Sequence, residues 1–188
     1  ESCVIGIGPA KSPFMTLSRS EMSFPVVKQA RRQQLLDAAP RLAELLKIEQ
    51  LTPEIVAEAA SLAEADFTAE FASIGHYLAE VHTRFMEGLR AHLLKVAGDQ
   101  KPGLERTLCA ANAQLDVCLE QHALRAWMAE ARRKIPLVAE DLHMRNRAYS
   151  MMIGLELTNV SGNKAMSRVA ARMFCMMILE AAPIEADS

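Results

Sequence analysis

The sequence is poor in the residues that build sheets and tight turns. Its 188 residues include only 8 glycines, 8 prolines and 5% aromatic residues, which disfavours a sandwich or a barrel. Its longest uncharged stretches fall far short of the roughly 18 apolar residues that a membrane span needs. The first residues show no basic segment followed by an apolar run, so we expect no signal peptide and no membrane partner. With 51% hydrophobic residues, the chain predicts a folded, all-α protein.

Cysteine and histidine are also scarce and poorly placed for cross-linking or metal binding. The four cysteines form no CxxC pair, and Cys109 and Cys118 fall on opposite faces of one predicted helix. This pattern disfavours a disulfide framework or a zinc site and fits a reducing cytoplasm, which is the predicted location. The five histidines show no i, i+4 pair with a third ligand nearby, and no nucleophile motif is present. We therefore expect no metal, no cofactor and no enzymatic activity.

Charge is distributed unevenly along the chain. Residues 1–47 carry seven Lys and Arg against four acids, and residues 84–188 carry fourteen against twelve. Residues 48–83 carry seven acids and no Lys or Arg at all. Such a block is either an ordinary solvated face or an acidic surface for a partner.

Helical periodicity begins at Lys28 and continues to residue 46, with Pro40 expected to kink or split that helix. Before it, three prolines predict an irregular arm over 1–27. Thr52, Pro53 and Glu54 form a strong helix start because they supply an N-cap, a preset first residue and an acid in the first turn. The predicted later helices span 53–60, 64–71, 74–96, 104–120, 122–134, 136–159 and 163–181.

Two short helices joined by a tight turn after a first helix form a helix-turn-helix pattern. The segments RRQQLLDAAPRLAELL (31–46) and LTPEIVAEAASLAEADFTAEFASIGHYLAEV (51–81) resemble the N-terminal domain of the TetR family, the tetracycline-repressor-like regulators. The segments GLERTLCAANAQLDVCLEQHALRAWMAEARR (103–133) and AARMFCMMILEAA (170–182) are similar to the ligand-binding and dimerisation domain of some members. The resemblance implies a three-helix helix-turn-helix domain over 28–80 and a helical ligand-binding and dimerisation bundle over 81–188.

The sequence departs from the family pattern at several positions. Members usually have Gly where Lys47 and Ser61 stand and often have Ser or Thr at Ala63. They also have a basic residue near Glu64, a Tyr at Thr68 and a Lys at Ile74, of which the last two normally touch DNA phosphates. DNA affinity comes largely from cations that neutralise phosphates, so these departures put direct DNA binding in doubt. The residues expected at a DNA surface are Arg31, Arg32, Thr52, Thr68, Ser73 and His76.

Two further sets of residues follow from the same analysis. Large apolar and Met side chains beyond residue 82 are either core or the walls of a cavity for a small apolar ligand, and a cavity is what the resemblance implies. The run 173–179 is apolar almost all round, which fits burial against a second copy of the chain or, alternatively, a central helix of a monomer. The expected pocket residues are Phe85, Leu89, His122, Trp127, Tyr149 and Met152. The expected dimer residues are Met166, Val169, Met173, Met176 and Met177. Phe67 and Phe71 are expected in the core.

Three functional hypotheses remain open from the sequence. The first is a ligand-responsive, homodimeric transcription regulator that binds double-stranded DNA. The second is the same fold without DNA binding, acting through its acidic face on a protein partner. The third is a small-molecule carrier. Outward-pointing Glu64, Asp66 and Glu70 would favour the second, whereas arginines that cover them would favour the first.

Overall fold

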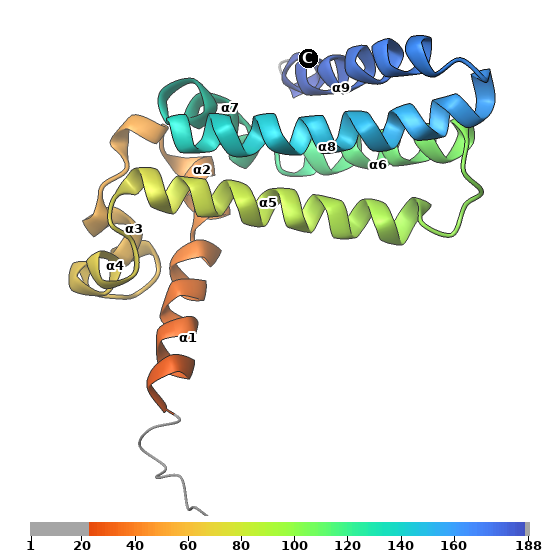
Figure 1. Ribbon diagram of the computed structural model, residues 1–188. Helices are drawn as coiled ribbons and strands as arrows, with labels where there is room; N and C mark the ends of the chain where they lie inside the picture. Colours follow the sequence, from red (N-terminus) through yellow and green to blue (C-terminus); the bar gives the residue numbers. More distant parts are fainter. Residues whose placement is uncertain (1–22, 187–188) are drawn as a thin grey trace, which may run out of the picture.

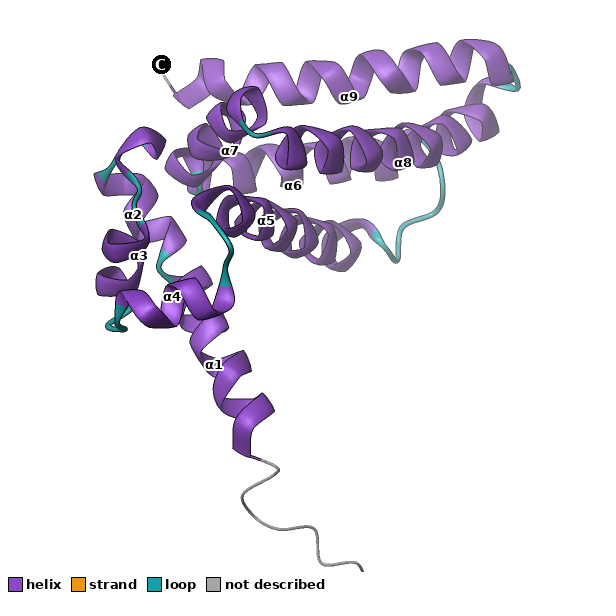
Figure 2. Ribbon diagram, turned by 60° about the vertical axis from the view of Figure 1, so that its left-hand side comes forward, coloured by secondary structure: helices purple, strands orange, loops and turns teal. Residues whose placement is uncertain are grey.

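The computed structural model describes the backbone of residues 23–186 and the side chains of residues 29–175. All regular structure in these residues is helical, which confirms the all-α prediction (Figure 1, Figure 2). The helices are α1 (Ser23–Asp37), α2 (Ala39–Leu45), a 3-10 turn η1 (Ile48–Gln50), α3 (Pro53–Ala59), α4 (Glu64–Glu70), α5 (Ile74–Ala97), α6 (Leu104–Glu120), α7 (His122–Lys134), α8 (Pro136–Ser161) and α9 (Lys164–Ala186).

The long helices α5, α6, α8 and α9 lie alongside one another (Figure 1). Helices α1 to α4, here called the N-terminal unit, lie at one end of this group, and α1 points away from it. Helix α7 lies at the same end and packs against α2. The group of long helices therefore has one end near the N-terminal unit and one end remote from it.

The first helix is divided as the sequence predicts. Helix α1 ends at Asp37, and Pro40 lies in the first turn of α2, where its missing N–H costs no hydrogen bond. Helix α1 begins at Ser23, however, so residues 23–27 are helical and the prediction of an irregular arm was wrong for them. The rest of that arm lies outside the described residues.

Helices α3 and α4 begin and end close to the predicted positions. Thr52 Oγ1 accepts a hydrogen bond from Ile55 N at 3.2 Å, as an N-cap does. The turn between the helices passes through Ser61, whose φ of 57° lies in the left-handed region. Asp66 Oδ2 accepts a hydrogen bond from Ala63 N at 3.2 Å and thereby helps to fix the start of α4.

Three aromatic rings form the centre of the N-terminal unit. The Phe67, Phe71 and Tyr77 rings have centroids 5.3 to 5.8 Å apart, and all three residues are buried, which confirms the prediction for the two phenylalanines. The Tyr77 hydroxyl donates a hydrogen bond to the Leu35 carbonyl at 3.1 Å, so its one polar group is satisfied. Burial raises the pKa of Tyr77 well above the ordinary value for tyrosine.

This core does not stop at the predicted domain boundary of residue 80. The same buried cluster includes Trp127 and Ala131 of α7 and Val138 of α8. Trp127 Nε1 donates a hydrogen bond to the Leu46 carbonyl at 2.7 Å. Helix α7 is therefore anchored to the N-terminal unit by both burial and a hydrogen bond.

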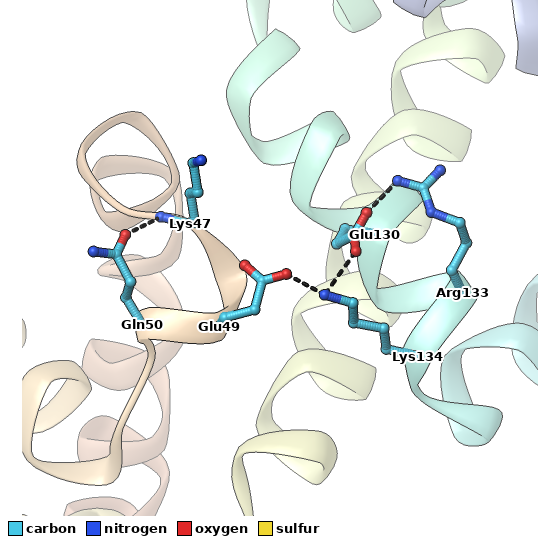
Figure 3. A network of polar contacts seen from close by, with 6 residues as sticks. All are labelled: Lys47, Glu49, Gln50, Glu130, Arg133 and Lys134. Atoms are coloured by element: carbon cyan, nitrogen blue, oxygen red, sulfur yellow. Dashed lines mark hydrogen bonds and ion pairs between the residues drawn. The ribbon is translucent and has the colours of Figure 1, made fainter.

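An exposed ion network adds a second contact between α7 and the N-terminal unit (Figure 3). Lys134 Nζ lies 2.8 Å from Glu130 Oε1 and also pairs with Glu49 of η1. Arg133 pairs with Glu130 as well. Because these side chains are solvated, the network adds little stability and mainly fixes orientation.

The later helices follow the predicted pattern except α9, which runs to Ala186, five residues beyond its predicted end at residue 181. The loop after α5 and the bounds of α6 and α7 agree with the sequence, and α8 extends two residues beyond the predicted end. Helix α8 ends at Ser161 and is capped by Gly162, whose φ of 66° suits glycine. No helix in the described residues is sufficiently long and apolar to cross a bilayer.

The left-handed backbone at Ser61 leads to a stability prediction. Ser61→Gly should raise the free energy of unfolding by about 0.5 to 1 kcal/mol, because glycine adopts this conformation without the steric cost of a Cβ. Urea denaturation followed by circular dichroism measures the effect. Ala60→Gly is the matched control: Ala60 has φ −88°, so glycine there should lower stability. Equal effects at both positions would contradict this account of the turn.

Candidate functional site

A cavity of about 320 Å³ lies among the long helices. Its walls come from α5, α6, α8 and α9, with one residue from α7. The volume lies at the lower end of the range for small-molecule sites, and the lining is mostly apolar. The apolar lining includes Phe85, Met86, Leu89, Leu93, Ala110, Ala111, Met152, Ile153 and Phe174. Such a space can hold a small ligand with a substantial apolar part.

Four of the six residues predicted for a ligand pocket line this cavity, namely Phe85, Leu89, Tyr149 and Met152. The other two, Trp127 and His122, do not line it. Trp127 packs into the core of the N-terminal unit, where its indole N–H donates a hydrogen bond to the Leu46 carbonyl. His122 is exposed at the first position of α7, away from the lining. The size and polarity of Trp127 and His122 do not indicate which face of α7 packs against the N-terminal unit, so the sequence alone could not place these two residues.

Sequence analysis missed the charged side chains of the cavity. Three arginines, Arg90, Arg106 and Arg125, and one acid, Glu156, contribute to its lining. Arg106 pairs with Glu156, which also accepts a hydrogen bond from Gly103 N at 2.7 Å. A charged residue of an amphipathic helix is ordinarily expected to face solvent. The helical pattern therefore did not predict that these four side chains line the cavity.

Tyr149 brings a hydroxyl group to the cavity wall. The side chain is half-buried, and burial raises the pKa of Tyr149, although the charges of Arg145 and Arg90 act in the opposite direction. The hydroxyl is therefore protonated near neutral pH and available as a hydrogen-bond donor.

The arginines expected to contact DNA have partners within the N-terminal unit instead. Arg31 Nη1 lies 2.8 Å from Asp66 Oδ1. Arg32 Nε donates to Glu80 Oε1 at 2.8 Å, its Nη1 donates to the Glu70 carbonyl at 2.7 Å, and its guanidinium lies 4.4 Å from the centre of the Phe71 ring. These groups join α1 to α4 and α5. A DNA phosphate that bound either arginine would therefore have to replace these contacts.

The other four residues expected at a DNA surface are exposed, and each of their side chains makes a local contact. Thr52 caps α3, and Thr68 Oγ1 donates to the Ala65 carbonyl at 3.1 Å. Ser73 Oγ accepts from His76 N at 3.3 Å and lies 2.9 Å from His76 Nδ1. Ser73 and His76 are thus brought together at the start of α5, whereas the two threonines are not.

The three acids of α4 have different surroundings. Glu64 is exposed. Asp66 is half-buried beside Arg31. The Glu70 side chain is 3% exposed, and its Oε2 lies 3.7 Å from Arg32 Nη1 without a hydrogen bond. Only one of the three therefore points outward, and arginines of α1 contact the other two.

The outer faces of α8 and α9 carry exposed apolar side chains. Met166, Val169 and Met173 of α9 are 58 to 69% exposed, as the dimer prediction requires. Met151 and Leu155 of α8 are similarly exposed. The side chains of Met176 and Met177, also predicted at the interface, lie outside the described residues.

A buried histidine connects α5 with α8. His82 Nδ1 lies 2.8 Å from Asp141 Oδ2, which also accepts a hydrogen bond from Arg145 Nε at 2.8 Å. Burial lowers the pKa of His82, although its hydrogen bond to Asp141 acts in the opposite direction, and Arg145 and Arg132 lower the pKa further. His82 therefore stays neutral to lower pH than an ordinary histidine. No group of three metal-ligating side chains occurs among the described residues.

Comparison with known proteins gives no assignment. No protein-family model matches the sequence, and no curated protein matches it either. Function must therefore be argued from the cavity, the N-terminal unit and the exposed faces of α8 and α9.

The environment of His82 predicts a pH dependence of stability. Because its pKa is lower in the folded state than in the unfolded state, the unfolded chain binds the proton more readily. The free energy of unfolding should therefore fall as the pH drops through the ordinary histidine range, from about pH 7.5 to about pH 5.5. In His82→Gln this decrease should be smaller, whereas His143→Gln, at an exposed position, should keep it. Urea titrations at both pH values measure the difference, and identical pH slopes in all three proteins would refute the role of His82.

Proposed function

We propose that this protein is a TetR-like, ligand-responsive transcription regulator that acts as a homodimer. The observation that carries the proposal is the position of the cavity along α5. Tyr77 and Leu78 of this helix are buried in the core of the N-terminal unit, and Leu89 and Leu93, three to four turns later, line the cavity. A ligand in the cavity therefore contacts the same helix that supports the N-terminal unit.

The regulation would be a shift between two arrangements of the dimer. A ligand that fits the cavity better in one arrangement changes the spacing of the two N-terminal units, because α5 is continuous from the one region to the other. Helix α7 would move with the N-terminal unit, since Trp127 and Ala131 are buried in its core.

The N-terminal unit supplies features that suit a helix-turn-helix. Helix α3, the turn at Ser61 and helix α4 follow one another as two short helices and a tight turn, and α1 packs against both. In this proposal α4 is the recognition helix, and exposed Thr68, Ser73 and His76 face the DNA.

The exposed faces of α8 and α9 support the dimer. Side chains as apolar as Met166, Val169 and Met151 rarely gather on the surface of a monomer. A twofold contact between two copies would bury them against each other as a four-helix bundle.

One set of observations favours a second candidate function, action through a protein partner without DNA. Arg31 and Arg32 are held by acids of the same unit, and exposed Glu64 begins α4 where a DNA-binding protein benefits from a cation. An acidic face of this kind suits a basic surface on another regulator. The carrier hypothesis has no observation that favours it over these two.

DNA binding separates the two candidates. The purified protein should bind pools of random and genomic duplexes at about 50 mM salt, lose affinity steeply at about 200 mM salt, and enrich a palindrome. Glu64→Lys should raise non-specific affinity and steepen the salt dependence by about one unit per subunit, because it exchanges an exposed acid for a phosphate-binding cation. Glu120→Lys, an exposed acid at the end of α6, is the control and should have little effect. Absence of binding by the unmodified chain at low salt would favour the protein partner instead.

The proposed dimer gives a separate prediction. Val169→Arg places a charge in the centre of the apolar face of α9, and we expect the dissociation constant of the dimer to rise by at least about tenfold. Leu45→Arg, at an exposed apolar position of α2, should leave the dimer intact. Sedimentation equilibrium measures both variants. A wild-type chain that is monomeric at micromolar concentration would remove the dimer from the proposal.

A further inference from the structure

One charged group of the cavity lining, Arg90 of α5, has no ion-pair or hydrogen-bond partner among the residues whose side chains are described. It also lies close enough to Tyr149 of α8 for its charge to affect the phenol. A guanidinium on α5 and a hydroxyl on the neighbouring helix α8 thus both line a mostly apolar space.

The single acid in the described lining is already satisfied. Glu156 pairs with Arg106 through one carboxylate oxygen and accepts the Gly103 N–H through the other. A cationic ligand would therefore find no open carboxylate among the described lining residues. An anionic ligand would find Arg90 unpaired and would not have to break an existing pair.

We propose that the cavity binds a medium-chain carboxylate, with its carboxylate held by Arg90 and the Tyr149 hydroxyl and its alkyl chain among Met86, Leu89 and Ile153. This inference rests on the proposed function, because it gives a ligand class to the cavity of the proposed regulator. Arg matches the planar carboxylate with parallel N–H groups, and hydrogen bonds to a charged partner are stronger than those between neutral groups. The apolar walls favour binding of the alkyl chain, and Arg90 with the Tyr149 hydroxyl selects a ligand that carries a carboxylate.

The test compares three ligands that share one chain and differ in charge: decanoate, decylamine and decanol. Isothermal titration calorimetry with the 188-residue chain should show decanoate binding at least about tenfold more tightly than decanol, and decylamine more weakly than decanol. Arg90→Gln should reduce the affinity for decanoate about tenfold or more and leave the affinity for decanol within about twofold. Tyr149→Phe should reduce the affinity for decanoate about fivefold and spare decanol.

Arg147→Gln is the matched control, because Arg147 is an exposed arginine of α8 that does not line the cavity. It should bind all three ligands as the unmodified chain does. Circular dichroism melts check that each variant is folded. We expect Arg90→Gln to fold, because Arg90 is exposed and makes no ion pair or hydrogen bond with any described residue.

Each other outcome overturns the inference in a recognisable way. Equal affinity for decanoate and decanol, in both wild type and Arg90→Gln, would remove the anion selection but leave a ligand-binding regulator. Tighter binding of decylamine would mean that the lining selects a cation. No binding of any of the three would overturn the ligand class, and the DNA experiment would then decide the regulator proposal on its own.

Discussion

The first two turns of α5 bury Tyr77 and Leu78 among the helices of the N-terminal unit, and its later turns bury Met86 and Leu89 against α6 and α8. One rigid helix therefore belongs to two cores, and neither core can repack without affecting its position. The His82 contact with Asp141 lies between these two regions and ties the same helix to α8. The cavity, the attachment of the N-terminal unit and the proposed communication between them all depend on this shared burial.

The charges of the N-terminal unit show a compromise between stability and binding. Arg32 joins α1 to α4 and α5 by bonding Glu80, the Glu70 carbonyl and the face of Phe71 at once. Such contacts hold α4 in place and give the Glu80 carboxylate a partner, although Glu70 Oε2 has no hydrogen bond. They also withdraw a cation from the surface. A cation held in this way is less available to pair with an outside anion, such as the phosphate that the proposed DNA binding would require.

Helix positions were predictable because their signals are local. Pro40, the Thr52 cap and the loop before residue 104 act within a few residues of themselves, and the structure follows them. The spacing of Phe67 and Phe71 also revealed their burial. Contacts between distant residues were not predictable: the acid that pairs with Arg31 and the carbonyl that receives the Trp127 N–H lie 35 and 81 residues away. For the same reason four cavity residues were found among the large side chains, while the charged residues of the lining, Arg90, Arg106, Arg125 and Glu156, were not.

Trp127 is the one tryptophan of the chain, and it lies at the contact between α7 and α2, outside the cavity lining. Its fluorescence therefore reports on that contact and not on ligand touching the ring. A change in emission on addition of a ligand would mean that occupancy of the cavity had been transmitted to the N-terminal unit. Binding without a change in emission would mean that the ligand occupies the cavity while the contact between α7 and α2 is unchanged. The fluorescence of Trp127 thus distinguishes ligand occupancy of the cavity from transmission of that occupancy to the N-terminal unit.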